Sequence, residues 1–353
     1  MDVKNTYFVT SFFWKNYNAA SKAKIDVEEI FRKIGLKELN LFKDTINSKF
    51  RRISFKKLIE LLLINQKQYK NSNVIFQNGT GIDILIAPIL KKTFKDGKRI
   101  IFVHDVESLR RRRQIDYLRE KAIFPNFTHA ICWTKEISEF LKVELGFSGK
   151  TYVYDICDYL TNDISHLENS TDNIFPVNSK FIIAFAGNLS KWKSGFLHYV
   201  LSELSPKNYV IHLYGKGFDG PLKDQIMEYK GAYPPEELPR KIKAHFGLVW
   251  DGESVENISG TTGEYLRYNF PHKASLYMVS GLPIIVWKQA AVYRIVKEYD
   301  IGFGINSLKE IDEVLSNLSE NEYEKWKKNT VTLAYKISQG KNLENIIKQV
   351  IDD

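Results

Sequence analysis

The sequence predicts an α/β protein with two domains, each built on a parallel β-sheet. Short β-branched or aromatic runs alternate with longer segments of helical periodicity, which is typical of strand–helix–strand units. The alternation stops in a polar stretch and then starts again. A chain of 353 residues with 44% hydrophobic residues can also fill two cores of ordinary size.

In the first half, five short runs are predicted to be strands and the segments between them helices. The predicted strands are Tyr7–Ser11, Val74–Gln77, Arg99–His104, Ala130–Thr134 and Thr151–Tyr154. The predicted helices are Ala19–Ile34, Phe55–Gln66, Ile82–Phe94, Leu109–Ala122 and Lys135–Leu145.

A linker separates the two halves. The stretch Leu160–Lys180 is polar and contains Pro176, so we expect domains at residues 1–178 and 179–335. From Ile311 onward the sequence predicts helix only. Before that point, the predicted strands of the second half are Phe181–Ala186, Tyr209–Tyr214, Phe246–Trp250 and Pro283–Trp287.

The amino-acid composition limits which kinds of partner the protein could bind and in which cellular compartment it could act. The net charge of +9 suggests an anionic partner, but the excess is spread among many acidic residues, so we expect no dedicated nucleic-acid binding. The two cysteines, Cys132 and Cys157, are too few for a disulfide framework or a zinc cluster. The sequence has no signal-peptide pattern and no run of roughly 18 apolar residues. We therefore expect a cytoplasmic protein.

The segment Glu264–Val286 is the richest in groups that could bind a ligand. It predicts a loop, a helix and a buried strand, with Asn269 able to cap the helix and Pro271 suited to its first turn. A helix N-terminus at the carboxyl edge of a parallel sheet offers unpaired N–H groups to an anion. Lys273 is poorly placed for the helix dipole, and a bound pyrophosphate would compensate. The alternative is an ordinary helix with Lys273 facing water, and we favour the phosphate interpretation.

Two glycine-containing turns follow predicted strands of the second half. In the first, Gly187 would let a backbone approach a ligand and Asn188 could bond a diphosphate or a base, although a plain turn explains the pattern equally well. In the second, Gly215–Gly220 has the G-x-G-x-x-G spacing of a dinucleotide site. It follows the second strand of its half, and the usual acidic residue about 20 positions on is not evident. We therefore favour a backbone wall for a nucleobase over NAD or FAD binding.

In the first half, polar residues directly follow the predicted strand at 99–103. Ligand sites in open α/β sheets lie at such carboxyl ends. His104, Asp105, Glu107 and Arg110 could supply a general base and an anion clamp. For Glu107, a role in a capping and salt-bridge cluster is as good an explanation.

Two basic stretches have less specific explanations. Lys49–Ile59 precedes the apolar run Leu61–Ile64 and could dock on acidic lipid head groups, but a core-facing helix with a basic outer face is the commoner explanation. The run Arg110–Arg113 is more typical of a solvated helix face. Contact with the inner face of the cell membrane is therefore left open.

Several motifs are missing. The sequence has no Asp-x-Asp triplet, no phosphate-binding P-loop, no His-Glu-x-x-His and no Gly-x-Ser-x-Gly. The sequence therefore offers no obvious ligand set for a metal ion, and we expect no bound cofactor.

Together these segments resemble the GT-B accessory glucosyltransferases of bacterial serine-rich adhesin glycosylation and the related β-1,6-galactofuranosyltransferases of surface polysaccharide synthesis. The resemblance spans nearly the whole chain, and its last two motifs are fairly specific. The similar elements are Thr10-Ser11 with an Ala-rich helix, Val74–Gln77, His104-Asp105 with Leu109-Arg110, Ala186–Leu189, Tyr214–Gly217, Gly247–Gly252 and Tyr268–Ser275.

The resemblance implies a GT-B fold, in which two Rossmann-like domains face each other across a cleft. It implies that the last helix, predicted at 336–353, packs back on the first domain. It also implies an inverting transferase that uses a UDP-sugar without a metal ion and forms a homo-oligomer, either a dimer or a tetramer.

The same resemblance implies roles for individual residues. The residues implied to bind the UDP-sugar donor are Gly187, Asn188, Tyr214, Gly215, Lys216, Gly217, Asp251, Tyr268, Asn269, His272, Lys273 and Ser275. The residues implied to bind the acceptor are Thr10, Ser11, Gln77 and Arg110, and the catalytic base is Asp105 or, as a second choice, His104. One departure concerns the first loop, which reads Ser11-Phe12-Phe13-Trp14 where the family has a glycine near the sugar.

These inferences lead to one hypothesis with two alternatives. The hypothesis is transfer of a hexose, galactofuranose or glucose, from a UDP-sugar to a hydroxyl of a lipid-linked or protein-linked saccharide in bacterial surface polysaccharide or glycoprotein synthesis. A sugar-nucleotide epimerase of the same architecture would instead consume the UDP-sugar without an acceptor. A non-catalytic sugar-nucleotide-binding subunit would bind UDP without turnover.

Overall fold

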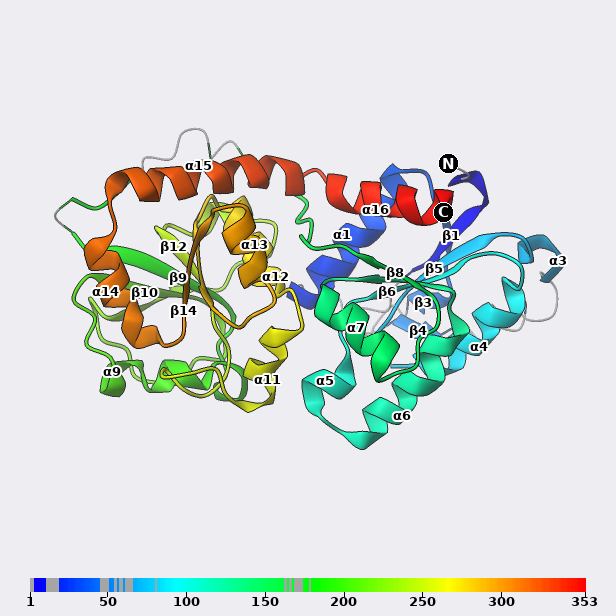
Figure 1. Cartoon of the computed structure of the whole chain (residues 1–353), viewed down its shortest axis with the longest axis horizontal. Helices are drawn as coiled ribbons and strands as arrows, with labels where there is room; N and C mark the ends of the chain where they lie inside the picture. The colour runs from blue at the N-terminus through cyan, green and yellow to red at the C-terminus, as the bar shows by residue number, and fades with distance from the viewer. Residues whose placement is uncertain are drawn as a thin grey trace. The chain divides into compact units, whose positions relative to one another are not determined.

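The chain divides into two compact units in its computed structural model (Figure 1). Unit 1 comprises Met1–Cys157 with Gly340–Asp353, and unit 2 comprises Asp158–Gln339. The structure describes residues 3–10, 19–44, 51–53, 56, 60, 66–79, 81–161, 164, 167, 174–177 and 179–353. The predicted folding domains, 1–178 and 179–335, stay a prediction.

Unit 1 contains a parallel sheet of six strands in the order β2-β1-β5-β6-β7-β8. Its inner strands are almost continuously buried, as expected when helices cover both faces of a parallel sheet. The strands are β1 (Thr6–Val9), β2 (Lys37–Leu39), β5 (Asn73–Gln77), β6 (Arg99–Val103), β7 (His129–Cys132) and β8 (Lys150–Val153), with a separate antiparallel pair β3 (Phe42–Asp44) and β4 (Arg51–Ile53).

The helices of unit 1 follow the predicted alternation with one correction. They are α1 (Ala19–Lys33), α3 (Gln66–Tyr69), α4 (Asp83–Thr93), α5 (Glu107–Arg111), α6 (Gln114–Ile123), α7 (Lys135–Val143) and α16 (Lys341–Asp352). The single helix predicted at Leu109–Ala122 is wrong, because Arg112 has left-handed backbone angles and ends α5 before α6 begins. The predicted helix Phe55–Gln66 falls almost entirely outside the described residues.

Unit 2 contains a second parallel sheet of six strands, in the order β11-β10-β9-β12-β13-β14. The strands are β9 (Phe181–Asn188), β10 (Tyr209–Lys216), β11 (Met227–Gly231), β12 (Phe246–Val249), β13 (Ile284–Trp287) and β14 (Gly302–Ile305). The helices are α8 (Lys191–Ser194), α9 (Val200–Glu203), α10 (Leu238–Lys241), α11 (Gly260–Glu264), α12 (His272–Val279), α13 (Tyr293–Glu298), α14 (Ile311–Asn317) and α15 (Glu320–Ile337). The all-helical ending predicted after Ile311 is confirmed.

The last helix belongs to unit 1. α16 packs against α1, and its apolar side chains Leu343, Ile347 and Val350 are completely buried. The Lys98 ammonium donates to the backbone oxygens of Val350 and Ile351, both at 2.9 Å, and so satisfies two carbonyls at the end of the helix.

Two further findings concern the predictions from composition. Both cysteines, Cys132 and Cys157, are buried free thiols, and burial raises the pKa of Cys132 to about 12. None of the helices that the described residues form is long and apolar enough to span a bilayer.

Candidate functional site

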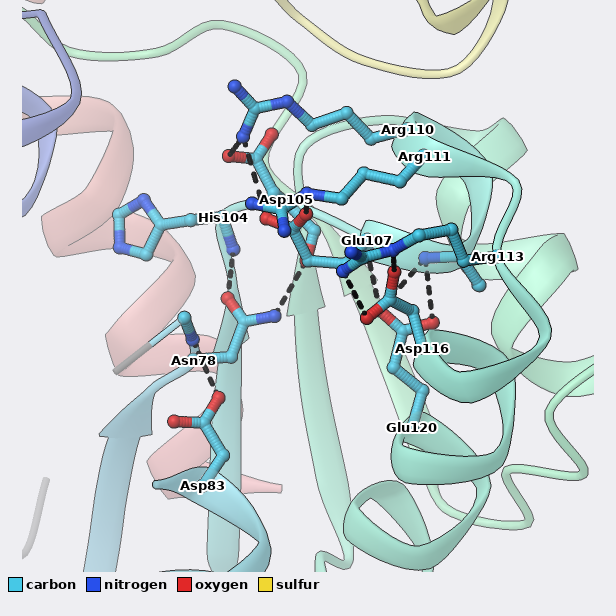
Figure 2. Close-up of polar contacts among 12 residues, drawn as sticks. Asn78, Asp83, His104, Asp105, Glu107, Arg110, Arg111, Arg113, Asp116 and Glu120 are labelled. Atoms are coloured by element: carbon cyan, nitrogen blue, oxygen red, sulfur yellow. Dashed lines mark hydrogen bonds and ion pairs between the residues drawn. The ribbon is translucent and has the colours of Figure 1, made fainter. Parts of the chain in front are cut away.

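Two loops meet at the carboxyl edge of the unit 1 sheet (Figure 2). They follow β5 and β6, and the Asn78 side chain joins them. Asn78 Oδ1 accepts from the backbone N–H of His104 at 2.8 Å, and Asn78 Nδ2 donates to the backbone oxygen of Asp105 at 2.7 Å. Asn78, which the sequence analysis did not single out, therefore holds the two candidate bases in place.

The His104 ring is held by a hydrogen bond and by aromatic contacts. His104 Nε2 lies 2.6 Å from Gln77 Oε1. Because an amide oxygen can only accept, this contact favours the tautomer with hydrogen on Nε2. The ring also packs against Phe102 and Trp133, with centroids 4.9 Å and 5.6 Å away. The structure thus brings His104 together with Gln77, a predicted acceptor residue.

Asp105 and Arg110 form an ion pair beside this ring (Figure 2). Arg110 Nη1 lies 3.2 Å from Asp105 Oδ2 and 3.5 Å from Glu107 Oε1. Arg111 Nε lies 2.5 Å from the other Glu107 oxygen. Burial raises the pKa of Glu107, and the charge of Arg110 opposes this shift. Glu107 therefore lies in a salt-bridge cluster, the role that the sequence left as its alternative.

Glu120, a residue that the sequence analysis missed, caps α5 from below (Figure 2). It lies on α6, and its Oε1 accepts from the backbone N–H of Glu107 at 2.6 Å. Its Oε2 lies 3.3 Å from the backbone nitrogen of Ser108. Burial raises the pKa of Glu120 to about 7. A buried carboxyl thus holds the start of the helix that carries Arg110.

A second missed residue, Lys24 on α1, lies beneath the β5 loop. Its ammonium is buried and donates to the backbone oxygens of Asn78 at 2.7 Å and Gly79 at 3.3 Å. The next turn is tied down as well, because Asp83 Oδ2 accepts from the backbone N–H of Gly79 at 2.7 Å. Burial lowers the pKa of Lys24, and the charges of Asp83 and Asp105 oppose this shift. The loop that positions His104 is therefore fixed from two sides.

The remaining predicted acceptor residues are Thr10 and Ser11, of which the structure describes Thr10. Thr10 is buried just beyond β1, and its Oγ1 donates to Asn40 Oδ1 at 3.3 Å. Ser11 and the bulky loop residues 12–14 lie outside the described residues, so their part in a site stays a prediction.

In unit 2, the ends of β9 and β10 form a glycine-rich edge. The two strands pair in register to their last residues, with Gly187 opposite Gly215 and Asn188 opposite Lys216. A Cβ on Gly215 would lie 1.9 Å from the Gly187 carbonyl oxygen, whereas one on Gly187 would meet no atom within 4 Å. Gly215 is therefore required for the close approach of the strands, and the Gly187 backbone is open to a ligand.

The neighbouring predicted donor residues differ in how they could act. Gly217 has a φ of +92°, and a Cβ there would lie 2.2 Å from Ser190 Oγ. Tyr214 is buried, its hydroxyl lies 3.3 Å from the Lys243 backbone nitrogen, and burial raises its pKa. Tyr214 therefore contributes to the core of this edge. Asn188 is exposed, and its Oδ1 accepts from the backbone N–H of Ser190 at 2.9 Å.

A buried lysine lies in the first turn of α12. Lys273 Nζ donates to Asp251 Oδ1 at 2.8 Å and lies 4.3 Å from the centre of the Phe185 ring. Lys193 Nζ approaches the other Asp251 oxygen at 3.8 Å. Burial lowers the pKa of Lys273, and the charge of Asp251 opposes this shift. The alternative that Lys273 simply faces water is wrong, because Asp251 supplies a buried partner for its charge.

The loop before α12 requires another correction. The residue that precedes the helix is Pro271, with no side-chain cap, so the prediction that Asn269 caps the helix is wrong. Asn269 Oδ1 is instead buried without a hydrogen-bond partner among the described residues. A buried amide oxygen in this position is costly unless a ligand or water donates to it.

The last three predicted donor residues lie just before this loop or in the helix that follows it. His272 stacks on Tyr159 with ring centroids 4.9 Å apart, and Ser275 is completely buried within α12. Tyr268 lies partly exposed at the end of the turn Tyr265–Arg267. Within the described ranges, no three His, Cys, Asp or Glu side chains form a group that could hold a metal ion.

Two family models together match most of the chain. The model described as "Glucosyltransferase 3-like, N-terminal domain" matches residues 6–154, and "Glucosyltransferase 3-like, C-terminal domain" matches residues 183–350. Among curated relatives, β-1,6-galactofuranosyltransferase WbbI of Escherichia coli strain K12 is 30% identical over 255 residues, covering 71% of this chain and 70% of that protein. Glucosyltransferase 3 of Streptococcus gordonii is 29% identical over 106 residues, covering 30% of this chain and 31% of that protein.

Solved structures share the fold at low sequence identity. HepE of Anabaena, solved with UDP and glucose, has a TM-score of 0.60 at 13% identity over 98% of both chains. Sucrose-phosphate synthase of Thermosynechococcus elongatus has a TM-score of 0.65 at 12% identity, covering 98% of this chain and 99% of that one. At this level of identity the likeness concerns the fold alone.

Proposed function

This chain belongs to the glucosyltransferase 3-like family of glycosyltransferases, with the GT-B type of α/β fold, and we propose that it moves a hexose from a UDP-sugar to a hydroxyl of a saccharide acceptor. The proposed sugar is galactofuranose, as the name of the Escherichia coli relative suggests, or glucose, as the name of the Streptococcus gordonii relative suggests.

The proposed binding of the UDP-sugar donor rests on the cluster of charges at the start of α12. Two lysines, Lys273 and Lys193, share one carboxylate, Asp251, so two positive charges face one negative charge and one positive charge is left over. The dipole of α12 adds a partial positive charge at the helix N-terminus, in the same place. This arrangement supports binding of the pyrophosphate of UDP, where the cluster would stabilise the charge of the leaving group.

The uncapped start of α12 and the open Gly187 backbone support the same assignment. Asn269 Oδ1 offers a buried acceptor to the nucleotide, and the glycines after β9 and β10 let a ligand approach the backbone closely. We assign the nucleobase to the wall made by Gly215–Gly217.

In unit 1, we assign the acceptor to the loops after β5 and β6. Asp105, or His104 as the second choice, would take the proton of the acceptor hydroxyl while that oxygen attacks the anomeric carbon and UDP leaves with the bonding electron pair. Attack from the side opposite UDP inverts the anomeric centre. Gln77 and Arg110 contact the candidate bases and would orient them.

Several parts of the proposal rest on the family resemblance. We propose that transfer needs no metal ion, that the acceptor is a lipid-linked or protein-linked saccharide of the bacterial surface, and that the protein acts in the cytoplasm as a homo-oligomer.

The test combines ligand binding with turnover, in the presence of EDTA. The first measurement is thermal stabilisation of the full chain by UDP, UDP-glucose, UDP-galactose, UDP-galactofuranose, UDP-N-acetylglucosamine and NAD. A ligand at 100 times its Kd stabilises the fold by about 2.7 kcal/mol, which is easily seen. We expect stabilisation by UDP and by one UDP-sugar, followed by acceptor-dependent release of UDP.

The variant Asp105→Asn separates the two steps. It should keep the stabilisation by UDP and lower kcat by about 10²- to 10⁴-fold, and Asp96→Asn, on an exposed loop of the same unit, is the matched control. Full activity in Asp105→Asn with loss in His104→Gln would move the base to His104. Consumption of the UDP-sugar without an acceptor would indicate an epimerase, binding without turnover a binding subunit, and stabilisation by NAD alone would overturn the proposal.

A further inference from the structure

Helices α4 and α6 of unit 1 expose large aliphatic side chains. The two helices pack against each other (Figure 1). Ile84 and Leu85 on α4 are 43% and 56% exposed, and Ile115 and Leu118 on α6 are 50% and 54% exposed. We call the outer surface that carries these four residues the α4–α6 face.

The core of unit 1 does not explain these residues. α4 already buries Ile86, Ala87 and Leu90 on its inner side, and α6 buries Ile123. Each helix is therefore apolar on its inner side and carries further aliphatic residues on its outer side. Single exposed aliphatic residues are ordinary, but several on neighbouring helices mark an interaction surface.

The same face is positively charged. Lys91, Lys92, Arg119 and Lys121 are exposed on α4 and α6, and the ion pairs seen among the described residues include none of them. The carboxylates of the two helices, Asp83, Asp116 and Glu120, are all buried. The α4–α6 face thus presents aliphatic and cationic side chains and no exposed carboxylate from its own helices.

We propose that the α4–α6 face docks on a lipid surface rich in anionic head groups. Aliphatic side chains that enter the boundary between head groups and acyl chains, together with lysines and arginines around them, give the combination by which surface helices bind membranes. Each cation near an anionic membrane strengthens binding by about fivefold. The surface lies on helices of unit 1 and is distinct from the loops assigned to the acceptor, so this inference goes beyond the proposed function.

Charge complementarity favours a lipid surface over other partners. In a symmetric contact with a second copy, the same patch would face itself and bring like charges together. A nucleic acid would use the cations but would gain little from four aliphatic side chains, since single strands stack on aromatic rings. Anionic lipid uses both kinds of side chain at once.

The test measures binding of the full chain to sedimented vesicles of phosphatidylcholine, with and without phosphatidylglycerol. We expect binding only to the anionic vesicles. Replacing two cations, in Lys92→Glu with Arg119→Glu, should weaken it by at least about 25-fold, fivefold for each cation lost. Lys328→Glu with Lys336→Glu, two exposed positions on α15, makes the same change in charge elsewhere and should leave binding unchanged.

A second pair of variants tests the apolar part. Leu85→Ser with Leu118→Ser should weaken binding by about tenfold, while Val143→Ser, at a 77% exposed position on α7, should not. All of these positions are exposed, so thermal unfolding should stay close to that of the wild type.

Two outcomes would overturn the proposal. One is absence of binding to the anionic vesicles, or equal binding by the charge variant and its control. The other is binding that is insensitive to the leucine changes and is displaced by a short oligonucleotide, which would indicate general polyanion binding. The experiment uses no sugar donor or acceptor, so either failure leaves the proposed transferase activity untouched.

Discussion

At the scale of single residues, variants of the buried pair of Lys273 and Asp251 allow effects on stability to be measured separately from effects on UDP binding. The two side chains lie in unit 2 and are almost completely enclosed. Removing Lys273 leaves Asp251 with only the more distant ammonium of Lys193, 3.8 Å away, whereas removing both members leaves no buried carboxylate without its close partner.

We predict that Lys273→Met lowers the free energy of unfolding by about 1–3 kcal/mol, because Asp251 loses its close hydrogen-bond donor but keeps Lys193 at 3.8 Å. The double variant Lys273→Met with Asp251→Asn should recover most of this loss, yet both variants should be stabilised less by UDP than the wild type, because one of the two cations that face the pyrophosphate is gone. Urea unfolding and UDP titration of both variants measure these effects. Lys297→Met, at an exposed position on α13, is the control. UDP binding by the double variant at wild-type strength would remove Lys273 from the donor site.

Glu120 gives stability a dependence on pH. Burial raises the pKa of this carboxyl to about 7, against 4.5 in the unfolded chain, so between these values the folded state holds a proton that the unfolded state has lost. The free energy of unfolding therefore falls as the pH rises. From about pH 5.5 to pH 8 the loss from this group is about 2 kcal/mol.

We predict that Glu120→Gln, which keeps an oxygen acceptor for the start of α5, removes this part of the pH dependence. Urea unfolding at the two pH values should show a smaller decline for Glu120→Gln than for the wild type. Glu29→Gln, at an exposed position on α1, should decline as the wild type does. Equal declines in Glu120→Gln and the wild type would mean that Glu120 ionises normally in the folded state.

Several site residues that sequence analysis found lie at the ends of strands or helices, whereas two that it missed lie inside helices. Gln77 ends a strand, His104 follows one and Lys273 lies in the first turn of a helix, and such positions can be recognised from sequence. Lys24 and Glu120 lie within helices, where a charged residue normally faces water. Their burial depends on which helix face meets the sheet, and the charge pattern of one segment does not contain that information.

At the scale of elements, predictions succeeded where a segment was long or strongly apolar. β9, β10, β12 and β13 are apolar runs, and all four were predicted. Among the missed strands, β2, β11 and β14 are edge strands of the two large sheets and are rich in charged residues or glycine, so their pairing depends on a neighbouring strand. The break between α5 and α6 was missed because arginine carries no turn signal, and only the left-handed angles of Arg112 reveal it.

α16 yields a prediction at this scale. The Lys98 ammonium donates hydrogen bonds to two backbone carbonyls at the end of the helix. The Asp353 carboxylate contacts Lys150, and it accepts a hydrogen bond from the Tyr152 hydroxyl at 2.5 Å. We predict that Lys98→Met weakens the attachment of α16 by about 1–3 kcal/mol, because two partly buried carbonyls lose a charged donor. Hydrogen exchange of the α16 amides should become faster in Lys98→Met and stay unchanged in Lys95→Met, at a neighbouring exposed position. Unaltered exchange in Lys98→Met would contradict the prediction.

At the scale of the whole molecule, the fold class could be predicted because it depends on a pattern repeated along the chain. Alternation of strand and helix signals gave two parallel sheets, and the structure has two such sheets of six strands. Site assembly was less predictable. Residues far apart in sequence, such as Gly187 and Gly215, meet only because β9 and β10 pair in register.

Unit 1 is made from two stretches of chain, and this has a consequence for synthesis. The ribosome makes residues 340–353 only after all of unit 2, residues 158–339, so the surface of α1 that α16 covers stays open until unit 2 has been made. Unit 2 is one continuous stretch and has no such delay. Domains generally fold in the order of their synthesis, the N-terminal one first. In this protein we expect the reverse, with unit 2 reaching its final structure while unit 1 still waits for its last helix.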